Sequence, residues 1–509
     1  MGWAAVVLAT YLSILGLLSI NGLHRAWLVW AWVRRPGRQV PPTPAELPVV
    51  TVQLPLFDER YVVRRLVEAC AALDWPRDRL EIQVLDDSRD ETTAIAAALV
   101  ARYRSEGLDI HLVHRDDRQG FKAGALAAGL LSARGDVIAI FDADFVPPPD
   151  FLRRTVPWLE AGVGMVQTRW GHLNRRESWI TEAQATLLDG HFVIEHTARH
   201  RTGRWFNFNG TAGIWRRQAI DDAGGWSHDT LTEDLDLSYR AQLRGWRFVY
   251  LDDIVTPAEL PSDVRAFKTQ QHRWAKGSVQ TCRKLLGRIW ESDASLAIKL
   301  EATAHLTANF SYPLVLLLSL FLPWALAARI AQGPALLLAL DSVLLGAAIV
   351  PFVAFYGSAI AGSGSRDVGR RLLLLPIVLA VGLGMAVAQT KAVLDGLDGP
   401  VGSFVRTPKT GGSGSSGYGT GPTRIAWIEL AFGAYIGAAG LFALSQGYLA
   451  SLPFLALFGG GFTAVGLSTL LGPGQAAIPS ASSAGIQVTD HSQAGSVQAP
   501  LSSTVDKTP

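Results

Sequence analysis

Two acidic clusters are the residues best suited to hold a charged ligand. Asp87 follows a short β-branched run at residues 82–85, and Asp142-Ala-Asp144 follows another at residues 137–141. In open α/β sheets ligands bind beyond the carboxyl ends of the strands, so we expect both clusters at one edge. Carboxylates beside a phosphate ligand need a divalent cation between them, and oxygen ligands suit Mg2+ or Mn2+. We therefore predict Asp142 and Asp144 as metal ligands, although an isolated Asp-x-Asp is also typical of a turn that ends a strand.

The triplet Thr232-Glu233-Asp234 offers carboxylates for a different task. Transfer of an activated group to a hydroxyl needs a base to take the hydroxyl proton, and Asp234 is our candidate. The triplet is also typical of a helix start, with Thr232 as N-cap and acidic residues in the first turn. Both interpretations can hold together, because a helix start would fix Asp234 on a rigid element.

A basic and aromatic motif, Gln270-Gln-His-Arg-Trp274, precedes the apolar part of the chain. Arg273 offers a planar cation for a leaving diphosphate, and Trp274 offers a flat apolar face for stacking on a sugar. The surrounding pattern is equally that of a basic amphipathic helix bound to anionic lipid. Its basic residues are Arg265, Lys268, Lys276, Arg283, Lys284 and Arg288, and its apolar ones are Leu285, Leu286, Ile289 and Trp290.

The composition predicts a globular part and a membrane part in one chain. Of 509 residues, 49% are hydrophobic and 18% are charged, a high apolar share for a soluble protein. In the globular part, β-branched runs alternate with helical stretches, which indicates an α/β sheet with mostly parallel strands. The runs are 49–54, 82–85, 110–113 and 137–141, and the helical stretches include 64–73 and 122–132.

Several apolar runs approach the roughly 20 residues that cross a bilayer. The N-terminal run continues too far for a signal peptide, which indicates a retained anchor. Segment 372–388 is short, contains Pro376, and has basic residues on both flanks, so the positive-inside rule places both of its ends in the cytosol. We therefore predict that this segment lies at the interface or re-enters, leaving five spans; a sixth span is the alternative. The five predicted spans are 3–29, 306–328, 335–355, 425–444 and 452–471.

Charge and cysteine content argue against a nucleic-acid partner and against a disulfide bridge. The net charge is +2, and no dense run of Lys and Arg suits a nucleic-acid partner. The two cysteines, Cys70 and Cys282, fall in segments assigned to the cytosol and are expected to be reduced thiols. The tail after residue 473 is rich in Ser, Ala, Gln and Thr, and we assign it no function.

Taken together, the motifs resemble those of the family 2 glycosyltransferases, which include cellulose, hyaluronan, chitin and mannan synthases. The similarity is greatest to the cellulose synthase-like branch known for glucomannan and mannan synthesis, and it covers residues 49–286 closely. This resemblance implies a GT-A-like catalytic domain, α/β with a mixed and mostly parallel sheet, joined to an α-helical transmembrane bundle. The stretches that carry it are Gln83-Val-Leu-Asp-Asp-Ser88, Gly120-Phe-Lys-Ala-Gly-Ala125, Phe141-Asp-Ala-Asp-Phe145, Phe208-Asn-Gly-Thr-Ala-Gly213 and Gln270-Gln-His-Arg-Trp274.

The resemblance also implies a role for each matching residue. Asp234 would be the catalytic base, and Asp142 and Asp144 would bind the metal. Phe404-Val-Arg-Thr-Pro-Lys409 looks like a gating loop that covers the nucleotide, although Arg406 departs from the family pattern. Donor and nucleotide binding would fall to Asp87, Lys122, Asp142, Gln270, Arg273, Thr407 and Lys409. Acceptor binding would fall to Trp274, Phe208, Asn209, Gly210, Thr211 and Glu233.

These roles predict an inverting, processive hexosyltransferase that makes and translocates a β-linked polysaccharide, mannan or glucan. The donor would be GDP-mannose or UDP-glucose, the acceptor a growing glycan or a lipid, and the cofactor Mg2+ or Mn2+. A glycolipid synthase that transfers one glucose from UDP-glucose to diacylglycerol is an alternative, and a transporter with a nucleotide-sensing domain is a weaker one. We expect a multi-pass protein of the plasma (inner) membrane with a cytosolic catalytic domain, in contact with membrane lipid and able to form a homo-oligomer.

The predicted order of domains follows from these assignments. It comprises a transmembrane anchor (1–35), a linker (36–48), the catalytic domain (49–262), amphipathic interface helices (263–296), two transmembrane helices (297–360), an interface or re-entrant helix (372–397), a gating-type loop (398–422), two transmembrane helices (423–472) and a disordered tail (473–509).

Overall fold

The computed structural model describes residues 2–34, 40–332, 335–399, 402 and 424–472, and side chains at 332–341 are not described. The gating-type residues Thr407 and Lys409 and the tail after residue 472 lie outside the described residues. The described residues form one compact unit.

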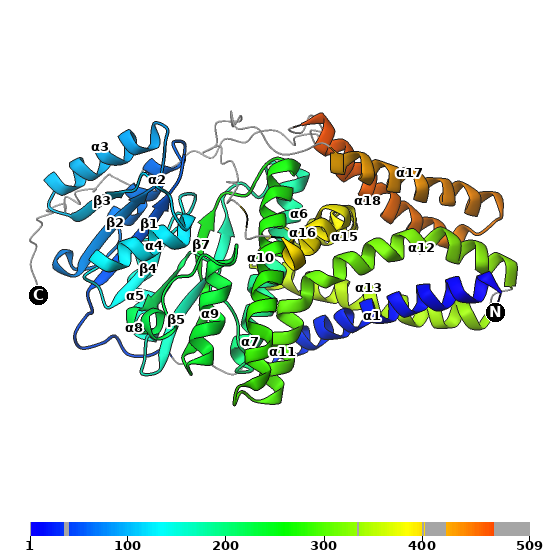
Figure 1. Cartoon of the computed structure of the whole chain (residues 1–509), viewed down its shortest axis with the longest axis horizontal. Helices are drawn as coiled ribbons and strands as arrows, with labels where there is room; N and C mark the ends of the chain where they lie inside the picture. The colour runs from blue at the N-terminus through cyan, green and yellow to red at the C-terminus, as the bar shows by residue number, and fades with distance from the viewer. Residues whose placement is uncertain (1, 35–39, 333–334, 400–401, 403–423, 473–509) are drawn as a thin grey trace, which may run out of the picture. The chain divides into compact units, whose positions relative to one another are not determined.

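A seven-stranded sheet with the order β3-β2-β1-β4-β6-β5-β7 is the centre of the globular part (Figure 1). Strands β1 to β4 are parallel to one another, β6 runs antiparallel to both β4 and β5, and β5 and β7 are parallel. The mixed, mostly parallel sheet is therefore confirmed. The strands are β1 (Val50–Leu56), β2 (Leu80–Asp86), β3 (Asp109–His114), β4 (Val137–Ile140), β5 (Val163–His172), β6 (Gly213–Arg216) and β7 (Arg247–Ala258).

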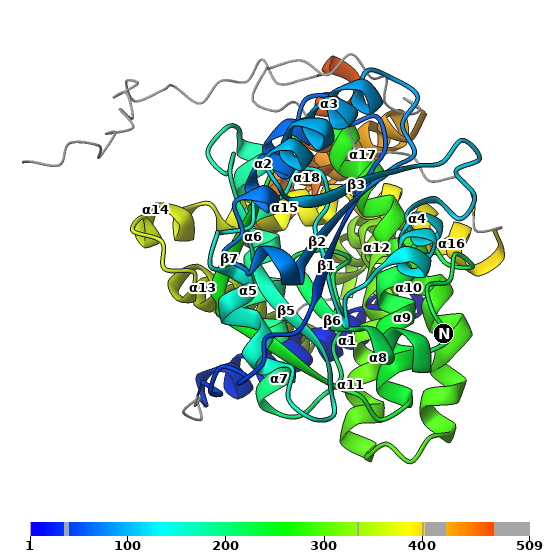
Figure 2. The same ribbon diagram turned by 90° about the vertical axis from the view of Figure 1, so that its left-hand side faces the viewer.

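Helices cover both faces of the sheet, so β1, β2 and β4 are buried along almost their whole length. One face packs on α2 (Val63–Ala71), α3 (Thr92–Ser105) and α5 (Phe151–Thr155). The other packs on α4 (Phe121–Ser132), α8 (Arg217–Asp222) and α9 (Glu233–Leu243) (Figure 2). Cys70 on α2 is a free, buried thiol, as is Cys282.

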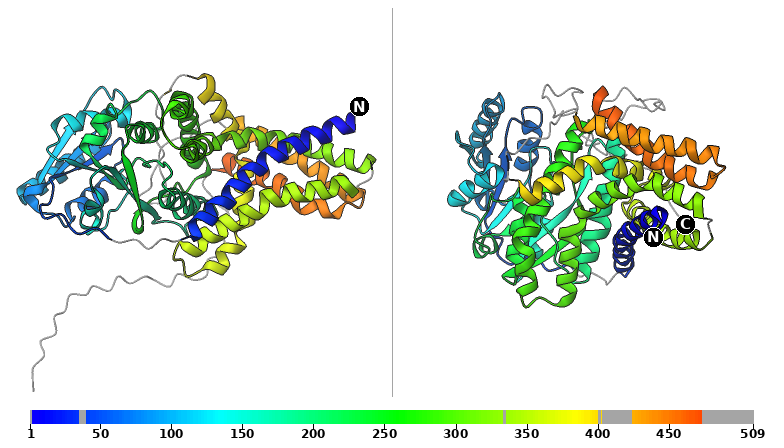
Figure 3. Two further views of the ribbon diagram at one scale, coloured as in Figure 1. Left: turned by 90° about the horizontal axis from the view of Figure 1, so that it is seen from below. Right: turned by 45° about the vertical axis from the view of Figure 1, so that its right-hand side comes forward.

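Among the described residues, five helical segments are long and apolar enough to cross a membrane, and they correspond to the five predicted spans. They lie side by side in Figure 3. The weak sixth segment is a bent pair, 368–384 and 386–398, with 44° between its halves. The elements are α1 (Trp3–Val33), α11 (Leu296–Thr307) with α12 (Ser311–Gln332), α13 (Ala335–Gly362), α17 (Arg424–Ser445) and α18 (Leu452–Leu471), and the bent pair comprises α14 (Val368–Leu373), α15 (Leu375–Gly384) and α16 (Ala386–Asp398).

A single long helix, α10 (Val264–Glu291), joins the sheet to the apolar helices. Asp263 caps it by accepting the Arg265 backbone N–H at 3.0 Å. The Lys268 ammonium on this helix pairs with the Glu429 carboxylate of α17 at 2.5 Å. The motif Gln270–Trp274 therefore lies on an element that is fixed at both the globular and the apolar side.

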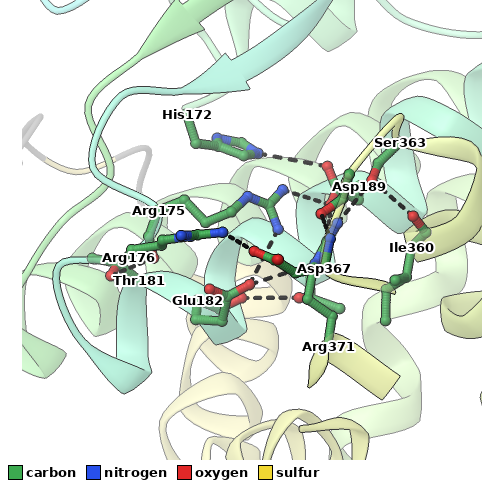
Figure 4. A network of polar contacts seen from close by, with 12 residues as sticks. His172, Arg175, Arg176, Thr181, Glu182, Asp189, Ile360, Ser363, Asp367 and Arg371 are labelled. Atoms are coloured by element: carbon green, nitrogen blue, oxygen red, sulfur yellow. Dashed lines mark hydrogen bonds and ion pairs between the residues drawn. The ribbon is translucent and has the colours of Figure 1, made fainter. Parts of the chain in front are cut away.

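A second polar network ties α14 to α6 (Trp179–Asp189) (Figure 4). The Arg371 guanidinium contacts Asp189 and lies 3.5 Å from Glu182. Arg175 donates to the same Asp189 carboxylate at 2.6 Å. Since Arg371 is only 4% exposed, this basic flanking residue binds the catalytic domain rather than a lipid headgroup.

Candidate active site

One pocket at the carboxyl edge of the sheet collects most of the predicted site residues. Its lining comes from strand ends, from the loop before β6, from the start of α9 and from α10. The convergence predicted for the two acidic clusters is therefore present. The predicted residues that line it are Asp87, Lys122, Asp142, Asp144, Asn209, Gly210, Glu233, Asp234, Gln270, Arg273 and Trp274.

Phe208 and Thr211 do not line the pocket, and both side chains are buried behind the residues that do. Phe208 is fully buried, and its ring packs edge-on against Trp215 with centroids 5.7 Å apart. The buried Thr211 hydroxyl accepts the backbone N–H of Asp142 at 2.8 Å. Both side chains therefore hold the neighbouring site residues in place.

Lys122 is the central cation of the pocket. Its ammonium pairs with Asp142 at 2.5 Å, donates to the Gly210 carbonyl at 2.9 Å and lies 3.9 Å from Glu233. Burial alone would lower the pKa of Lys122, but the carboxylates of Asp142 and Glu233 outweigh it, so the pKa is raised. Lys122 therefore remains charged and can neutralise part of an incoming diphosphate.

Asp234 lies in the first turn of α9, where a short rigid element directs it into the pocket. Burial and the neighbouring Glu233 raise its pKa to about 7, against a smaller opposing effect from Lys122. The helix begins directly after Thr232, as predicted, but the capping role of the Thr232 side chain was wrong. Its hydroxyl lies 3.3 Å from Thr281 Oγ1 on α10 instead, so it links two helices.

The end of the pocket near Asp87 contains residues that the sequence motifs did not indicate. Arg115 donates to both Asp87 oxygens, at 2.8 and 2.6 Å, and so fixes the orientation of that carboxylate. The Arg118 guanidinium stacks 3.3 Å above the Phe57 ring at the pocket wall. Arg118 has φ +49°, a left-handed conformation that is uncommon for a residue with a side chain and is often found at functional sites. Nothing in the residue pattern around Arg118 predicts this conformation.

At the opposite end, Gln270, Arg273 and Trp274 project from one face of α10, because residues three and four apart are neighbours on a helix. Burial lowers the pKa of Arg273, and the nearby Glu233 and Asp142 carboxylates oppose this effect. Trp274 is partly exposed, and its ring centroid lies 6.4 Å from that of Trp170. The pair forms an aromatic wall beside the carboxylates.

Asp142 and Asp144 fit a divalent metal only together with a ligand. Both offer carboxylate oxygens to the pocket, the donor type that Mg2+ and Mn2+ prefer. Within the described part of the chain, no group of three or more His, Cys, Asp or Glu side chains is arranged to hold an ion. The remaining ligands would therefore come from diphosphate oxygens and water, which is usual for Mg2+.

A mixed sheet with an Asp-x-Asp motif at its edge, facing a basic and aromatic helix across one pocket, is the arrangement of a GT-A-like domain. The family model described as "Glycosyltransferase like family 2" matches residues 48–277. The matched segment, 230 of the 509 residues, is therefore similar to the glycosyltransferases of this family.

Curated proteins similar to the chain include plant enzymes. The chain is 46% identical over 251 residues to glucomannan 4-beta-mannosyltransferase 2 of Arabidopsis thaliana, covering 48% of this chain and 47% of the relative. It is 43% identical over 272 residues to glucomannan 4-beta-mannosyltransferase 1 of Oryza sativa subsp. japonica, covering 50% and 52%. The chain thus spans about half the length of the curated relatives it matches.

A solved structure supports the fold. The mannosyltransferase PcManGT from Pyrobaculum calidifontis, in complex with GDP-Man and Mn2+, superposes with a TM-score of 0.50 at 22% identity. The match covers 77% of this chain and 99% of that one.

Proposed function

We propose that this chain is an inverting, processive hexosyltransferase that polymerises a β-linked hexose polysaccharide from a nucleotide sugar. The observation that carries the proposal is the half-buried Asp234, with its pKa raised to about 7, in one pocket with Lys122, Arg273 and Trp274. A base works best when its pKa is near the operating pH. The names of the relatives favour mannose as the sugar and GDP-mannose as the donor, and UDP-glucose is the second candidate.

The geometry suggests how the pocket performs the transfer. Asp234 takes the proton of the acceptor hydroxyl while the hydroxyl oxygen bonds to the anomeric carbon. The bond from that carbon to the diphosphate oxygen breaks on the opposite side, which inverts the anomeric centre. Lys122 and Arg273 stabilise the charge that leaves with the diphosphate, and Trp274 stacks on the acceptor sugar. A divalent metal bound by Asp142, Asp144 and the diphosphate would neutralise further charge.

Product analysis of the purified full chain tests this proposal. We expect long polymer from radiolabelled GDP-mannose or UDP-glucose in the presence of Mn2+ or Mg2+, and loss of product in excess EDTA. A single sugar on lipid would instead identify a glycolipid synthase, and no product from either donor would contradict the proposal.

The base assignment has its own test. Asp234→Asn should abolish transfer while leaving nucleotide diphosphate binding intact, because the amide cannot accept the proton. Asp221→Asn, an exposed carboxylate on α8, is the matched control and should remain active. Substantial turnover by Asp234→Asn would refute the assignment.

We further propose a plasma-membrane protein with the catalytic domain in the cytosol and five crossings, in which the bent pair does not cross. Support comes from contacts at both of its ends. Arg371 at its start binds Asp189 of α6, and Asp395 at its end lies 3.3 Å from His272 of α10. A segment that begins against α6 and ends against α10, the helix that carries Gln270–Trp274, is more consistent with re-entry than with crossing.

Cysteine labelling tests the topology in a background without Cys70 and Cys282. Leu373→Cys and Leu394→Cys, at positions 81% and 57% exposed, should both react from the side that labels Ser105→Cys on α3. Gln446→Cys, between α17 and α18, should react from the other side. Labelling of Leu394→Cys from the side opposite Ser105→Cys would establish a sixth crossing.

A further inference from the structure

A π-helix interrupts the helical segment that leads from α6 toward the candidate site. This helix, η3 (Gly190–His196), lies between α6 and α7 (Thr197–Arg201). π-helical turns are rare and often occur at functional sites. Within η3, Gly190 packs so closely on α13 that an added Cβ would lie 2.6 Å from a Phe355 ring carbon.

The π-helix brings together two histidines that an α-helix would separate. His191 and His196 are five residues apart, which in an α-helix of 3.6 residues per turn places them about 140° apart around the axis. The i→i+5 hydrogen-bond pattern of a π-helix places such residues about one turn apart instead. Their ring centroids are accordingly 4.3 Å apart.

Both histidines hold the same side chain, that of Asn209. His196 Nε2 lies 2.5 Å from Asn209 Oδ1, and Asn209 Nδ2 lies 2.9 Å from His191 Nε2. An amide oxygen only accepts and an amide nitrogen only donates, so His196 Nε2 donates and His191 Nε2 accepts. His191 therefore carries its proton on Nδ1, which donates to Glu195 at 3.0 Å.

This arrangement engages both polar ends of the Asn209 side chain, and further hydrogen bonds hold the backbone around it. The Asn209 N–H donates to Gln167 Oε1 at 3.0 Å. The next residue, Gly210, accepts Lys122 at 2.9 Å and has φ +81°. A Cβ added to Gly210 would lie 3.0 Å from Asp234 Oδ2, so this backbone directly borders the proposed base.

We propose that His191 and His196 are positioning residues for the transfer reaction. They act through Asn209, which sets Gly210 against Lys122 and Asp234. This inference rests on the proposed function, because the position of Gly210 affects activity only if the pocket carries out the transfer.

Polar contacts hold the π-helix from both directions. Toward the apolar helices, Glu195 pairs with Arg199 at 3.3 Å, and Arg199 pairs with Glu301 of α11 at 2.9 Å. The chain of contacts ends at His24 of α1, 2.9 Å from Glu301. On the N-terminal side, Asp189 is held by Arg175 and Arg371, as Figure 4 shows. The two histidines are therefore presented on a segment fixed at each end.

Kinetics of the full chain with a manno-oligosaccharide acceptor test the inference. Asn209→Ala and His191→Leu should each lower kcat/KM for the acceptor by about 100-fold, the effect of a 1 Å misplacement, with nucleotide diphosphate binding unchanged. The double variant His191→Leu/Asn209→Ala should have the same kcat/KM as either single variant, because His191 acts through Asn209. His191→Gln and His196→Gln can each form the same hydrogen bond to Asn209 and should retain most of the activity. His111→Leu, a half-exposed histidine on β3, is the control and should behave as the parent chain.

A second measurement does not depend on turnover. Hydrogen exchange of the peptide covering residues 206–212 should accelerate in His191→Leu and remain unchanged in His191→Gln. If the parent chain makes no product but hydrogen exchange follows this pattern, the proposed function is contradicted. The role of the histidines in holding Asn209 is then still supported. Additive losses in the double variant, no rescue by Gln, or unchanged exchange would each overturn the inference.

Discussion

Asp234 occupies a position in the pocket where a carboxyl group is hard to ionise, and its pKa is raised. It is partly withdrawn from solvent, and Glu233 precedes it in the chain, so both desolvation and like charge favour the protonated form. Lys122 offsets only part of this effect, and the pKa is raised to about 7. A carboxylate with such a pKa is a much stronger base than an exposed aspartate and still ionises at neutral pH.

The raised pKa predicts the pH dependence of transfer. Below about pH 7 Asp234 is protonated and cannot accept a proton, so kcat/KM should fall as the pH decreases through this value. Glu233→Gln removes the neighbouring negative charge, lowers the pKa of Asp234 and should move the acid limb to lower pH. Glu91→Gln, an exposed carboxylate, should leave the profile in place. An acid limb that does not move in Glu233→Gln would argue against Asp234 as the titrating base.

The sequence alone identified the site residues that lie in short contiguous motifs. It did not identify the residues whose partners are far away in the chain. Asp142-Ala-Asp144 and Gln270–Trp274 were recognisable because the whole motif is local. The pairing of Asp87 with Arg115 depends on a loop that starts after a different strand, and no spacing rule indicates it. His191 and His196 have a five-residue spacing that is meaningful only in a π-helix, which the pattern of apolar residues does not predict.

Among the elements, α10 depends on a close approach to the start of α9. Gly277 makes this possible, since an added Cβ would lie 2.5 Å from Thr232 Cγ2 and 2.9 Å from the Thr232 backbone nitrogen. The strands β1 to β4 were predictable because each contains a short run rich in β-branched and other apolar residues. The contact between α10 and Thr232 was not predictable from the sequence. Nothing in the residues around Gly277 marks this glycine, and its role is visible only when α9 packs against it.

Gly277→Ala should therefore separate the two halves of the site. The added methyl group forces α10 away from Thr232, which moves Arg273 and Trp274 relative to Asp234, and misplacement by 1 Å costs about 100-fold in rate. Gly287→Ala on the same helix is the matched control, because its Cβ would contact nothing within 4 Å. It should keep full activity and gain up to about 1 kcal/mol of stability from helix propensity. Equal activity of the two variants would show that the contact does not set the site geometry.

On the scale of the whole molecule, a few buried ion pairs join the catalytic domain to the apolar helices. Lys268 and Glu429 are 11% and 0% exposed, and Lys268 also donates to Thr469 Oγ1 of α18 at 2.6 Å. Arg371 and Asp189 form the corresponding contact at α14. These contacts combine residues more than 150 positions apart in the chain, which explains why hydropathy predicted the helices but not their attachment to the catalytic domain.

Removing one partner of the Lys268–Glu429 pair should destabilise the protein, because the other charge remains buried. Glu429→Gln should cost about 3–5 kcal/mol, the usual effect of breaking a buried pair, and lower the midpoint of thermal unfolding followed by tryptophan fluorescence. The double variant Lys268→Met/Glu429→Leu removes both charges and should recover most of the loss. Glu106→Ala breaks the exposed pair between Arg102 and Glu106 and should cost less than about 1 kcal/mol. If Glu429→Gln melted like Glu106→Ala, the pair would not fasten α10 to α17, and the position of Gln270–Trp274 would have to depend on other contacts of α10.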